Sequence, residues 1–206
     1  MNDAGDTDES DEELMLAYAA GDAAAFVRLY DRHERPVYRY FLRQSLQQAT
    51  ADDLLQETWL AVVRAATGYV PEAKFTTWLY TIARSKLIDH WRIARHDESL
   101  IDAAANDPDD ASDCAADFEE RLPAPDSARP DVQAMSRQEA QAFIVAVEAL
   151  PAVQRETFLL HVEGDATIEE IAVLTGVGAE TTKSRLRYAM NRLRGAWAAR
   201  ETARAS

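Results

Sequence analysis

The stretch that decides the fold is FTTWLYTIARSKLIDHWRIAR, residues 75–95. At about 100° per residue its apolar side chains fall on one broad arc, which is typical of a helix that packs on a core. The arc holds Phe75, Trp78, Leu79, Ile82, Ala83, Leu87, Ile93 and Ala94. Lys86 and Asp89 interrupt it, so we expect either that they pair at helical spacing or that the helix is covered only in part.

The opposite arc of the same helix combines cations, hydroxyls and large rings, without a carboxylate. It contains Thr77, Tyr80, Thr81, Arg84, Ser85, Trp91, Arg92 and Arg95. Rings can stack on unpaired bases and arginines can pair with phosphates, so this arc suits single-stranded nucleic acid. Packing of Tyr80 and Trp91 beneath another element explains the rings equally well, and both interpretations stay open from this helix alone.

The net charge of −14 argues at first against nucleic-acid binding, but the charge is unevenly distributed. Residues 1–13 contribute −7 and residues 97–139 contribute −10, which leaves +3 for the remainder. We expect two acidic segments to mask a mildly basic folded part and to weaken duplex binding by the free chain. For residues 1–13, an acidic tail kept for solubility is the alternative.

Several classes of site are not expected from the composition. Cys114 is the single cysteine, so we expect no internal disulfide, and the four histidines are too scattered for a metal site. We expect no cofactor and no enzyme activity, because no nucleophile-base constellation or phosphate-binding loop is present. The N-terminus is acidic rather than signal-like and no apolar run reaches about 20 residues, so we expect a cytoplasmic protein without membrane insertion.

Helix signals divide residues 14–96 into short segments. Leu14 to Ala20 is predicted as a helix that ends at Gly21, and Asp22 is a candidate N-cap for the next helix. Pro36 is expected to interrupt that second helix and to open a third. Since no strand-like alternation occurs, this region is predicted to form a compact helical bundle.

Thr50 and Asp53 resemble a capping box ahead of a strongly periodic segment, DDLLQETWLAVVRAA. Leu55, Trp59 and Val62 form its apolar side. Its polar residues lie mainly elsewhere: Asp52, Asp53, Gln56, Glu57 and Arg64. A polar row beside a tryptophan could dock another protein, but spacing alone favours an ordinary solvated helix face.

The composition changes at residue 97, where prolines and acids replace the helical periodicity. We predict an acidic flexible linker over residues 97–138, and a solvated spacer is favoured over a segment threaded through a basic channel. Periodicity returns near Ser136, and Pro151 is expected to end that helix and to open the next.

Residues 139–200 have the pattern of a helix-turn-helix. Thr167 and Glu170 form a second predicted capping box, and the turn at 175–178 contains Gly176. The final helix has an apolar stripe that should dock on the preceding helices, made of Leu186, Ala189, Leu193 and Trp197. Its remaining side chains are mostly cations and donors that suit phosphates and base edges. A surface helix with a basic C-terminus is the alternative, but the turn and the basic helix together favour DNA binding.

These features together resemble a sigma factor of bacterial RNA polymerase, in the compact extracytoplasmic-function (ECF) group of the sigma-70 family. DDLLQETW resembles the family's polymerase-binding motif, and FTTWLYTIARSKLIDHWR resembles its promoter-melting and minus-10-reading helix. ALPAVQRETFLLHVEG, with the helix-turn-helix after it, resembles its minus-35 domain. The implied fold is all-α: an acidic disordered tail (1–13), an N-terminal helical domain (14–96), the acidic linker (97–138), a helix-turn-helix domain (139–200) and a short tail (201–206).

The resemblance implies three sets of binding residues. The polymerase-binding set is Asp53, Gln56, Glu57 and Trp59. The minus-10 DNA set is Lys74, Thr77, Tyr80, Arg84, Ser85, Trp91 and Arg92, next to a loop at 68–74 that captures a flipped base. The minus-35 DNA set is Lys183, Ser184, Arg185, Arg187 and Tyr188. Asparagine is common in the family in place of Ser85, and basic residues are common in place of Tyr188 and Met190, so base preferences are not transferable from relatives.

The function implied is that of an initiation factor, which directs core RNA polymerase to promoters and promotes DNA melting. The implied partners are promoter DNA, the clamp helices of the largest polymerase subunit, the flap region and, as in many family members, an anti-sigma factor. A stand-alone helix-turn-helix regulator that binds duplex DNA without polymerase is the alternative. The aromatic-basic helix and the DDLLQETW motif weigh against that alternative, since such a regulator needs neither.

Overall fold

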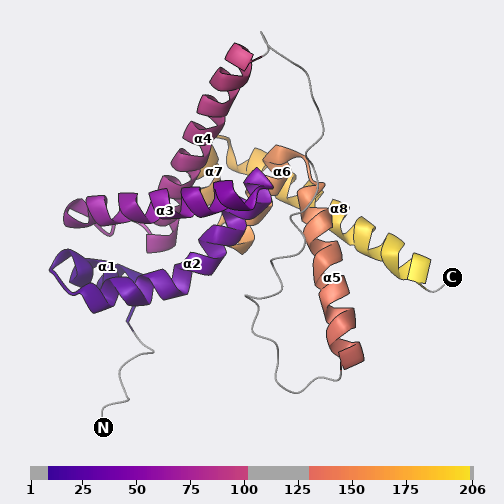
Figure 1. Cartoon of the computed structure of the whole chain (residues 1–206), viewed down its shortest axis with the longest axis horizontal. Coiled ribbons are helices and arrows are strands. Elements are labelled where there is room, and N and C mark those ends of the chain that lie inside the picture. Colours follow the sequence, from indigo (N-terminus) through magenta and orange to yellow (C-terminus); the bar gives the residue numbers. More distant parts are fainter. Residues whose placement is uncertain (1–8, 102–129, 205–206) are drawn as a thin grey trace.

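The computed structural model describes residues 9–101 and 130–204, and the regular structure in these two ranges is entirely helical (Figure 1). The elements are α1 (Asp11–Ala19), α2 (Ala23–Ser45), α3 (Gln48–Ala65), the short 3-10 helix η1 (Ala66–Gly68), α4 (Phe75–Ile101), α5 (Pro130–Glu148), α6 (Ala152–Val162), α7 (Ile168–Thr175) and α8 (Ala179–Arg204). The predicted all-α class is therefore confirmed. We call α1 to α4 with η1 the N-terminal unit, and α5 to α8 the C-terminal unit.

The core of the N-terminal unit lies where α2, α3 and α4 pack together. The apolar arc of α4 is buried as predicted over its first half, with Phe75, Leu79 and Leu87 fully buried. Further along, Ile93 is exposed, so this helix is covered only in part. Lys86 and Asp89 do not pair with each other: Lys86 reaches Glu57 on α3 at 3.3 Å and Asp89 pairs with Arg92 at 2.9 Å.

α2 continues through Pro36, contrary to the prediction that this proline opens a new helix. Asp22 caps its start as predicted, accepting a hydrogen bond from the amide of Ala24 at 2.9 Å. A proline inside a helix removes one backbone hydrogen bond and costs about 3 kcal/mol. Burial of Leu29 before it and of Val37 after it offsets this cost, since each buried aliphatic side chain contributes about 1.5–3 kcal/mol.

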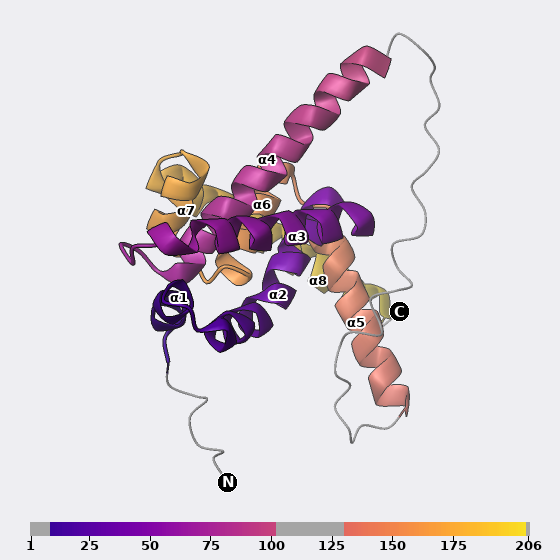
Figure 2. The same ribbon diagram turned by 60° about the vertical axis from the view of Figure 1, so that its left-hand side comes forward.

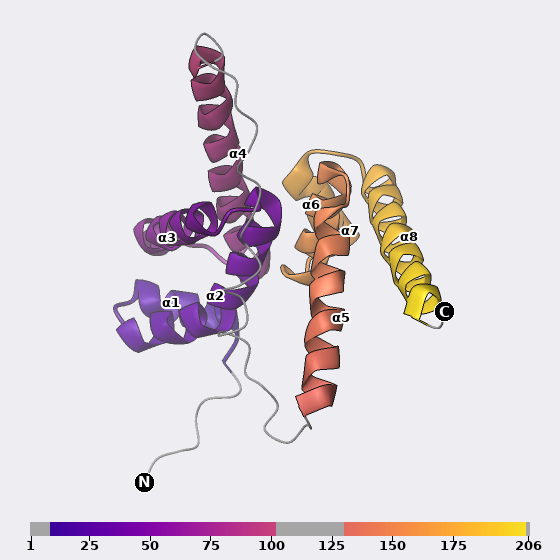
Figure 3. The same ribbon diagram turned by 45° about the vertical axis from the view of Figure 1, so that its right-hand side comes forward.

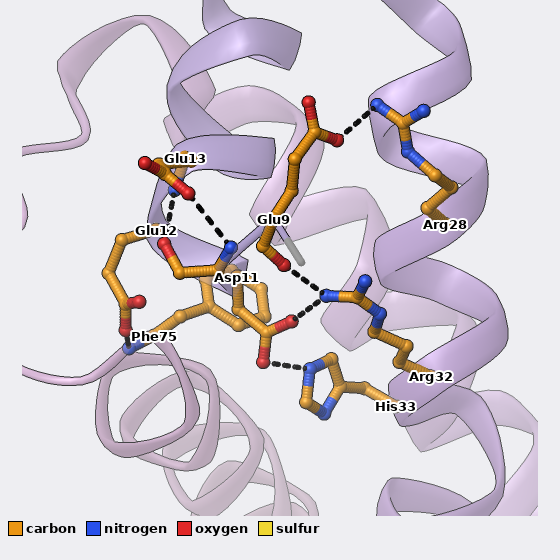
Figure 4. Close-up of polar contacts among 9 residues, drawn as sticks. Glu9, Asp11, Glu12, Glu13, Arg28, Arg32, His33 and Phe75 are labelled. Atoms are coloured by element: carbon orange, nitrogen blue, oxygen red, sulfur yellow. Dashed lines mark hydrogen bonds and ion pairs between the residues drawn. The ribbon is translucent and has the colours of Figure 1, made fainter. Parts of the chain in front are cut away.

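α1 begins within the segment that was predicted to be an acidic tail (Figure 4). Ser10 and Glu13 form a capping box, while Asp11 accepts hydrogen bonds from Arg32 and His33 of α2 at 2.9 and 2.7 Å. These acids therefore have structural partners, which composition alone does not reveal. The rest of the predicted tail, residues 1–8, lies outside the described residues.

Glu12, also on α1, accepts a hydrogen bond from the amide of Phe75 at 2.6 Å (Figure 4). That amide is one of the unpaired donors at the start of α4. A carboxylate from the first helix thus caps the helix that organises the N-terminal unit.

Three helix ends differ from the prediction. α3 begins at Gln48 without a side-chain cap, and Thr50 donates to the side chain of Gln47 instead of forming a capping box with Asp53. α4 extends to Ile101 and α5 begins at Pro130, so both ends of the predicted linker are helical. The remainder of that linker, residues 102–129, lies outside the described residues.

The C-terminal unit contains the predicted helix-turn-helix in α7 and α8. Thr167 and Glu170 form the capping box of α7, and Gly176 ends that helix in the left-handed conformation, with φ 69°. Ala189 and Leu193 of α8 are buried against α6 and α7, as the apolar stripe predicts.

The two units pack against each other through α2 with α5 and α6, and through α4 with α7. Figure 2 shows the start of α4 beside α7, and Figure 3 shows α8 on the side of the C-terminal unit that faces away from the N-terminal unit. Within residues 9–101 and 130–204, no helix is long and apolar enough to span a membrane.

Candidate polymerase and nucleic-acid interfaces

The polar residues predicted to bind polymerase lie on the exposed side of α3. Asp53, Gln56 and Glu57 are exposed, while Leu55 and Thr58 of the same helix are buried. The Thr58 hydroxyl donates to the Leu54 carbonyl at 2.7 Å, so this polar group is satisfied within the core. These three exposed side chains therefore do not pack α3 against the core, although Glu57 contacts Lys86.

Trp59 differs from the other predicted polymerase-binding residues because only 5% of it is exposed. Its ring lies 5.0 Å from that of Tyr30 and 5.7 Å from that of Phe26, between α2 and α3. These rings form the floor of a surface groove, and the exposed side chains of Gln56 and Leu60 also line it. Trp59 therefore shapes the surface beside Gln56 rather than projecting from it.

The minus-10 set is divided between exposed and covered side chains. Lys74, Ser85 and Arg92 are exposed, while Thr77, Arg84 and Trp91 are partly buried. Tyr80 is almost fully buried, with 1% exposed, so the expectation of an open aromatic face is wrong at this residue. Its ring packs edge-on against Tyr40 at 5.3 Å, and Gly164 of the C-terminal unit lies so close that a Cβ added there would be 3.2 Å from Cδ2 of Tyr80.

The hydroxyl of Tyr80 has no hydrogen-bond partner among the described residues, and neither has that of Tyr40. An unsatisfied buried polar group costs about 1–3 kcal/mol. Burial raises the pKa of Tyr80 well above its ordinary value, with Glu163 and Tyr40 adding to the effect. The Tyr80 hydroxyl is therefore un-ionised, and the packing of the ring leaves this hydroxyl without a hydrogen bond.

Carboxylates of the C-terminal unit occupy three residues of the minus-10 set. Arg84 Nε donates to Glu156 Oε1 at 2.8 Å, the Thr77 hydroxyl donates to Glu170 at 2.9 Å, and Lys74 Nζ lies 3.9 Å from Asp165. Burial raises the pKa of Glu170, but hydrogen bonds from Thr167 and Thr77 and the charge of Lys74 outweigh it, so that the net pKa is lowered. Glu170 is accordingly ionised at neutral pH.

Two further pairs connect the units through α2, and the sequence analysis did not single out any of these residues. Arg39 holds both carboxylate oxygens of Glu163, at 2.6 to 3.0 Å, and these hydrogen bonds raise the pKa of Arg39. Arg43 donates to Glu148 at 3.2 Å. The sequence does contain a pattern that indicates these contacts. Arg39 and Arg43 are four residues apart, and Glu156 and Glu163 are seven apart, so the two arginines share one helix face and the two glutamates share another.

The minus-35 set lies in the first half of α8. Lys183, Arg187 and Tyr188 are exposed, and Ser184 and Arg185 are partly buried. The guanidinium of Arg187 lies 5.3 Å from the centre of the Tyr188 ring, which is within the range of a cation-π contact. Among the salt bridges of the described residues, none joins a carboxylate to Lys183, Arg185 or Arg187.

Within residues 9–101 and 130–204, no group of three or more His, Cys, Asp or Glu side chains could hold a metal ion.

Residues 9–101 and 130–204 form helices with an exposed polar helix face, a cation-rich helix and a C-terminal helix-turn-helix, an arrangement typical of a DNA-binding protein with an additional docking surface. Family models match it in two places: Sigma-70 region 2 over residues 29–96 and Sigma-70, region 4 over residues 140–193. RNA polymerase sigma factor CarQ of Myxococcus xanthus is 30% identical over 180 residues, which is 87% of this chain and 93% of CarQ. ECF RNA polymerase sigma factor RpoE of Cereibacter sphaeroides is 33% identical over 197 residues, or 91% and 97% of the two chains.

The arrangement of helices is also similar to that of a solved sigma factor. RpoE of Bartonella quintana, determined in complex with the anti-sigma factor NepR, superimposes with a TM-score of 0.61 at 21% identity, over 84% of this chain and 96% of that one. The chain belongs to the extracytoplasmic-function group of the sigma-70 family. It is a promoter-specific initiation factor that binds core RNA polymerase.

Proposed function

We propose that this sigma factor acts through three surfaces and has no catalysis of its own. Asp53, Gln56 and Glu57 bind the clamp helices of the largest polymerase subunit, with Trp59 supporting the groove beside them. The observation that carries this proposal is that the apolar side of α3 is used by the core, which leaves these polar side chains exposed.

The second surface is the minus-10 surface, formed by Lys74, Thr77, Tyr80, Arg84, Ser85, Trp91 and Arg92. Its cations neutralise phosphates of the melted non-template strand, while Trp91 offers a ring for stacking at about 1–3 kcal/mol per base. Binding energy gained on the single strand drives the melting of the duplex. The flipped base enters the loop at residues 68–74, where unstacking is repaid by contacts in the pocket.

The third surface is the start of α8, which enters the major groove of the minus-35 element. Lys183, Arg187 and their neighbours contact phosphates and base edges there. The C-terminal unit also meets the flap region of polymerase, so that both units are bound when the promoter is engaged. The two units act as separate domains, and the chain works in the cytoplasm, where the polymerase is.

An anti-sigma factor is proposed as a further partner. The solved Bartonella RpoE was determined with such an inhibitor, and its fold matches this chain over most of both lengths. The inhibitor would have to cover one of the three surfaces, and the exposed side of α3 and the groove next to it offer polar and apolar groups together.

Run-off transcription tests the proposal directly. Core polymerase with this protein, on genomic fragments, should give discrete start sites that are absent with core polymerase alone. A stand-alone regulator would instead bind duplex DNA tightly and specifically in a gel shift without polymerase, and would give no new start sites. An enzyme would show turnover that one carboxylate substitution abolishes.

A further inference from the structure

We infer that Glu12 is a positioning residue for the base-capture loop, residues 68–74. Its carboxylate fixes the point at which this loop enters α4, and thereby strengthens the hold of the loop on a flipped base. The inference rests on the function proposed above, which assigns the flipped base of the minus-10 element to this loop. It adds a residue of α1 that acts through the loop rather than by contact with DNA.

The start of α4 has no cap from its own sequence. Lys74 directly precedes the helix, and its carbonyl accepts the first helical hydrogen bond, from the amide of Trp78 at 3.2 Å. A lysine side chain contains no acceptor, and the first turn of α4 contains no acid. The free amides at this end of the helix therefore need an acceptor from elsewhere in the chain.

Glu12 supplies this acceptor, although it precedes Phe75 by 63 residues. Its Oε1 accepts a hydrogen bond from the amide of Phe75 at 2.6 Å, and the side chain of Phe75 is fully buried (Figure 4). A hydrogen bond to a carboxylate is about twice as strong as one between neutral groups, and negative charge is favoured at the N-terminus of a helix. Glu12 thus joins α1 to the residue at which the loop ends and α4 begins.

α1 holds Glu12 in a defined place. Leu14 and Met15 of the same helix are fully buried in the core of the N-terminal unit. On the other side of Glu12, the carboxylate of Asp11 accepts a hydrogen bond from Arg32 of α2 at 2.9 Å. Because α1 is anchored on both sides of Glu12, the bond to Phe75 ties the start of α4 to the core.

The other end of the loop is anchored by Tyr69, which is 8% exposed. Its ring lies edge-on to those of Trp78 and Phe75, at 4.9 and 6.3 Å between ring centres. Burial raises the pKa of Tyr69 to about 12, and the charges of Glu12 and Asp11 add to the effect, so these carboxylates lie near this end as well. Residues 70–74, between the two anchors, are all exposed.

A loop that is ordered before the base arrives binds it more tightly. Flipping a base costs a few kcal/mol of unstacking, which contacts in the pocket must offset. Without the acceptor of Glu12, the first turn of α4 frays, and the loop has to be ordered at the moment of binding. Loss of Glu12 should therefore weaken capture of the flipped base and leave contacts with phosphates unchanged.

The test uses the full chain, assembled with core polymerase. Glu12→Ala removes the acceptor and the charge, whereas Glu12→Gln keeps an acceptor of the same shape. Asp31→Ala, which removes an acid from an exposed position of α2, is the control. The probes are a labelled single strand with the non-template minus-10 sequence of a mapped start site, and the same strand made abasic at the position where base removal weakens the parent most.

We expect Glu12→Ala to bind the intact strand about fivefold more weakly than the parent, which corresponds to the loss of one helix cap. Glu12→Gln should recover most of this loss, and the control should equal the parent. On the abasic strand all four proteins should bind equally. An equal loss by Glu12→Ala on both strands, or no loss on either, would overturn the inference.

Hydrogen exchange in the free full chain provides a measurement without DNA. Peptides that cover residues 69–78 should exchange faster in Glu12→Ala and at nearly the parent rate in Glu12→Gln, while α3 is unchanged. Parent-like exchange of residues 69–78 in Glu12→Ala would also overturn the inference. Failure of the proposed function looks different: the parent itself would bind every abasic strand as tightly as the intact one, which removes base capture and the role of Glu12 in it together.

Discussion

Arg84 donates from Nε to Oε1 of Glu156 at 2.8 Å, and this bond joins the helix proposed to read the minus-10 element to the unit proposed to read the minus-35 element. The guanidinium of Arg84 therefore has a hydrogen-bond partner in the absence of DNA. A guanidinium that already has a carboxylate partner loses that interaction when it takes a phosphate, so the net gain from DNA is smaller than the contact alone suggests.

The same contact changes the explanation of the acidic charge. The charge distribution predicts that masking comes from residues 1–13 and 97–139. In the described residues, acids of the first segment have partners within the N-terminal unit: Glu9 and Asp11 pair with Arg28 and Arg32 of α2, and Glu12 accepts a hydrogen bond from the amide of Phe75 at the start of α4. The carboxylates that contact Thr77 and Arg84 on the polar side of α4 come from α7 and α6 of the C-terminal unit.

The docking surface on α3 is tested by Asp53→Ala combined with Gln56→Ala. Both side chains are exposed and alanine favours helix, so the fold should be retained. We expect core polymerase to bind about thirtyfold more weakly, or about 2 kcal/mol, in a competition assay against the parent. The control is Asp31→Ala with Gln48→Ala, which removes the same groups from other exposed positions. Full affinity in the first variant would remove this docking assignment.

The proposed minus-35 contact of α8 is tested by Arg187→Ala. If Arg187 reads a base edge, its loss should lower initiation from cognate promoters by about 1–3 kcal/mol and relax the preference at one base pair. If it contacts a phosphate, the loss should be similar on all promoters and the salt dependence should weaken. Arg35→Ala removes an exposed cation from α2 as the control. Unchanged transcription from every cognate promoter would contradict either role.

Local signals predicted much of the fold because they depend on neighbours in the sequence. The capping box at Thr167, the turn at Gly176 and the N-cap at Asp22 are each present as expected. The prediction at Pro36 was wrong because burial of residues on both sides of this proline outweighs the local preference, whereas Thr50 has a competing local partner in the side chain of Gln47. A helix end that depends on distant packing has no local signature.

Helical periodicity predicted which helix faces form the candidate surfaces. It did not predict which side chains on those faces are buried. Periodicity placed Tyr80 on the polar side of α4, and the family resemblance gave that side a function. Burial of Tyr80 depends on Tyr40 and Gly164, which are 40 and 84 residues away in sequence. For Tyr80 the interpretation left open is therefore decided by contacts with α2 and with the C-terminal unit, which spacing within one helix does not encode.

The contact between α1 and α2 should make stability depend on acid pH (Figure 4). Burial raises the pKa of Asp11, but His33 and Arg32 outweigh it, so the folded-state pKa is below the ordinary value of 3.8. The stabilisation is complete above the unfolded pKa and is lost as pH falls through the folded one. Urea unfolding between pH 7 and pH 3 should show this loss in the parent and a flatter profile in Asp11→Asn. Asp31→Asn, on an exposed side chain, should follow the parent, and equal profiles in all three would contradict the role of Asp11.

Gly176 and Gly195 provide a matched pair for the helix-turn-helix, because an added Cβ meets no atom within 4 Å at either position. Any effect of alanine is then conformational. At Gly176, with φ 69°, alanine must adopt the left-handed region, so Gly176→Ala should lower the free energy of unfolding by about 1 kcal/mol. Gly195 lies inside α8, where alanine is the better helix former, so Gly195→Ala should raise it by about 0.5–1 kcal/mol. Urea unfolding of the two variants should give shifts of opposite sign, and a stabilising shift at Gly176 would show that the left-handed turn is not required between α7 and α8.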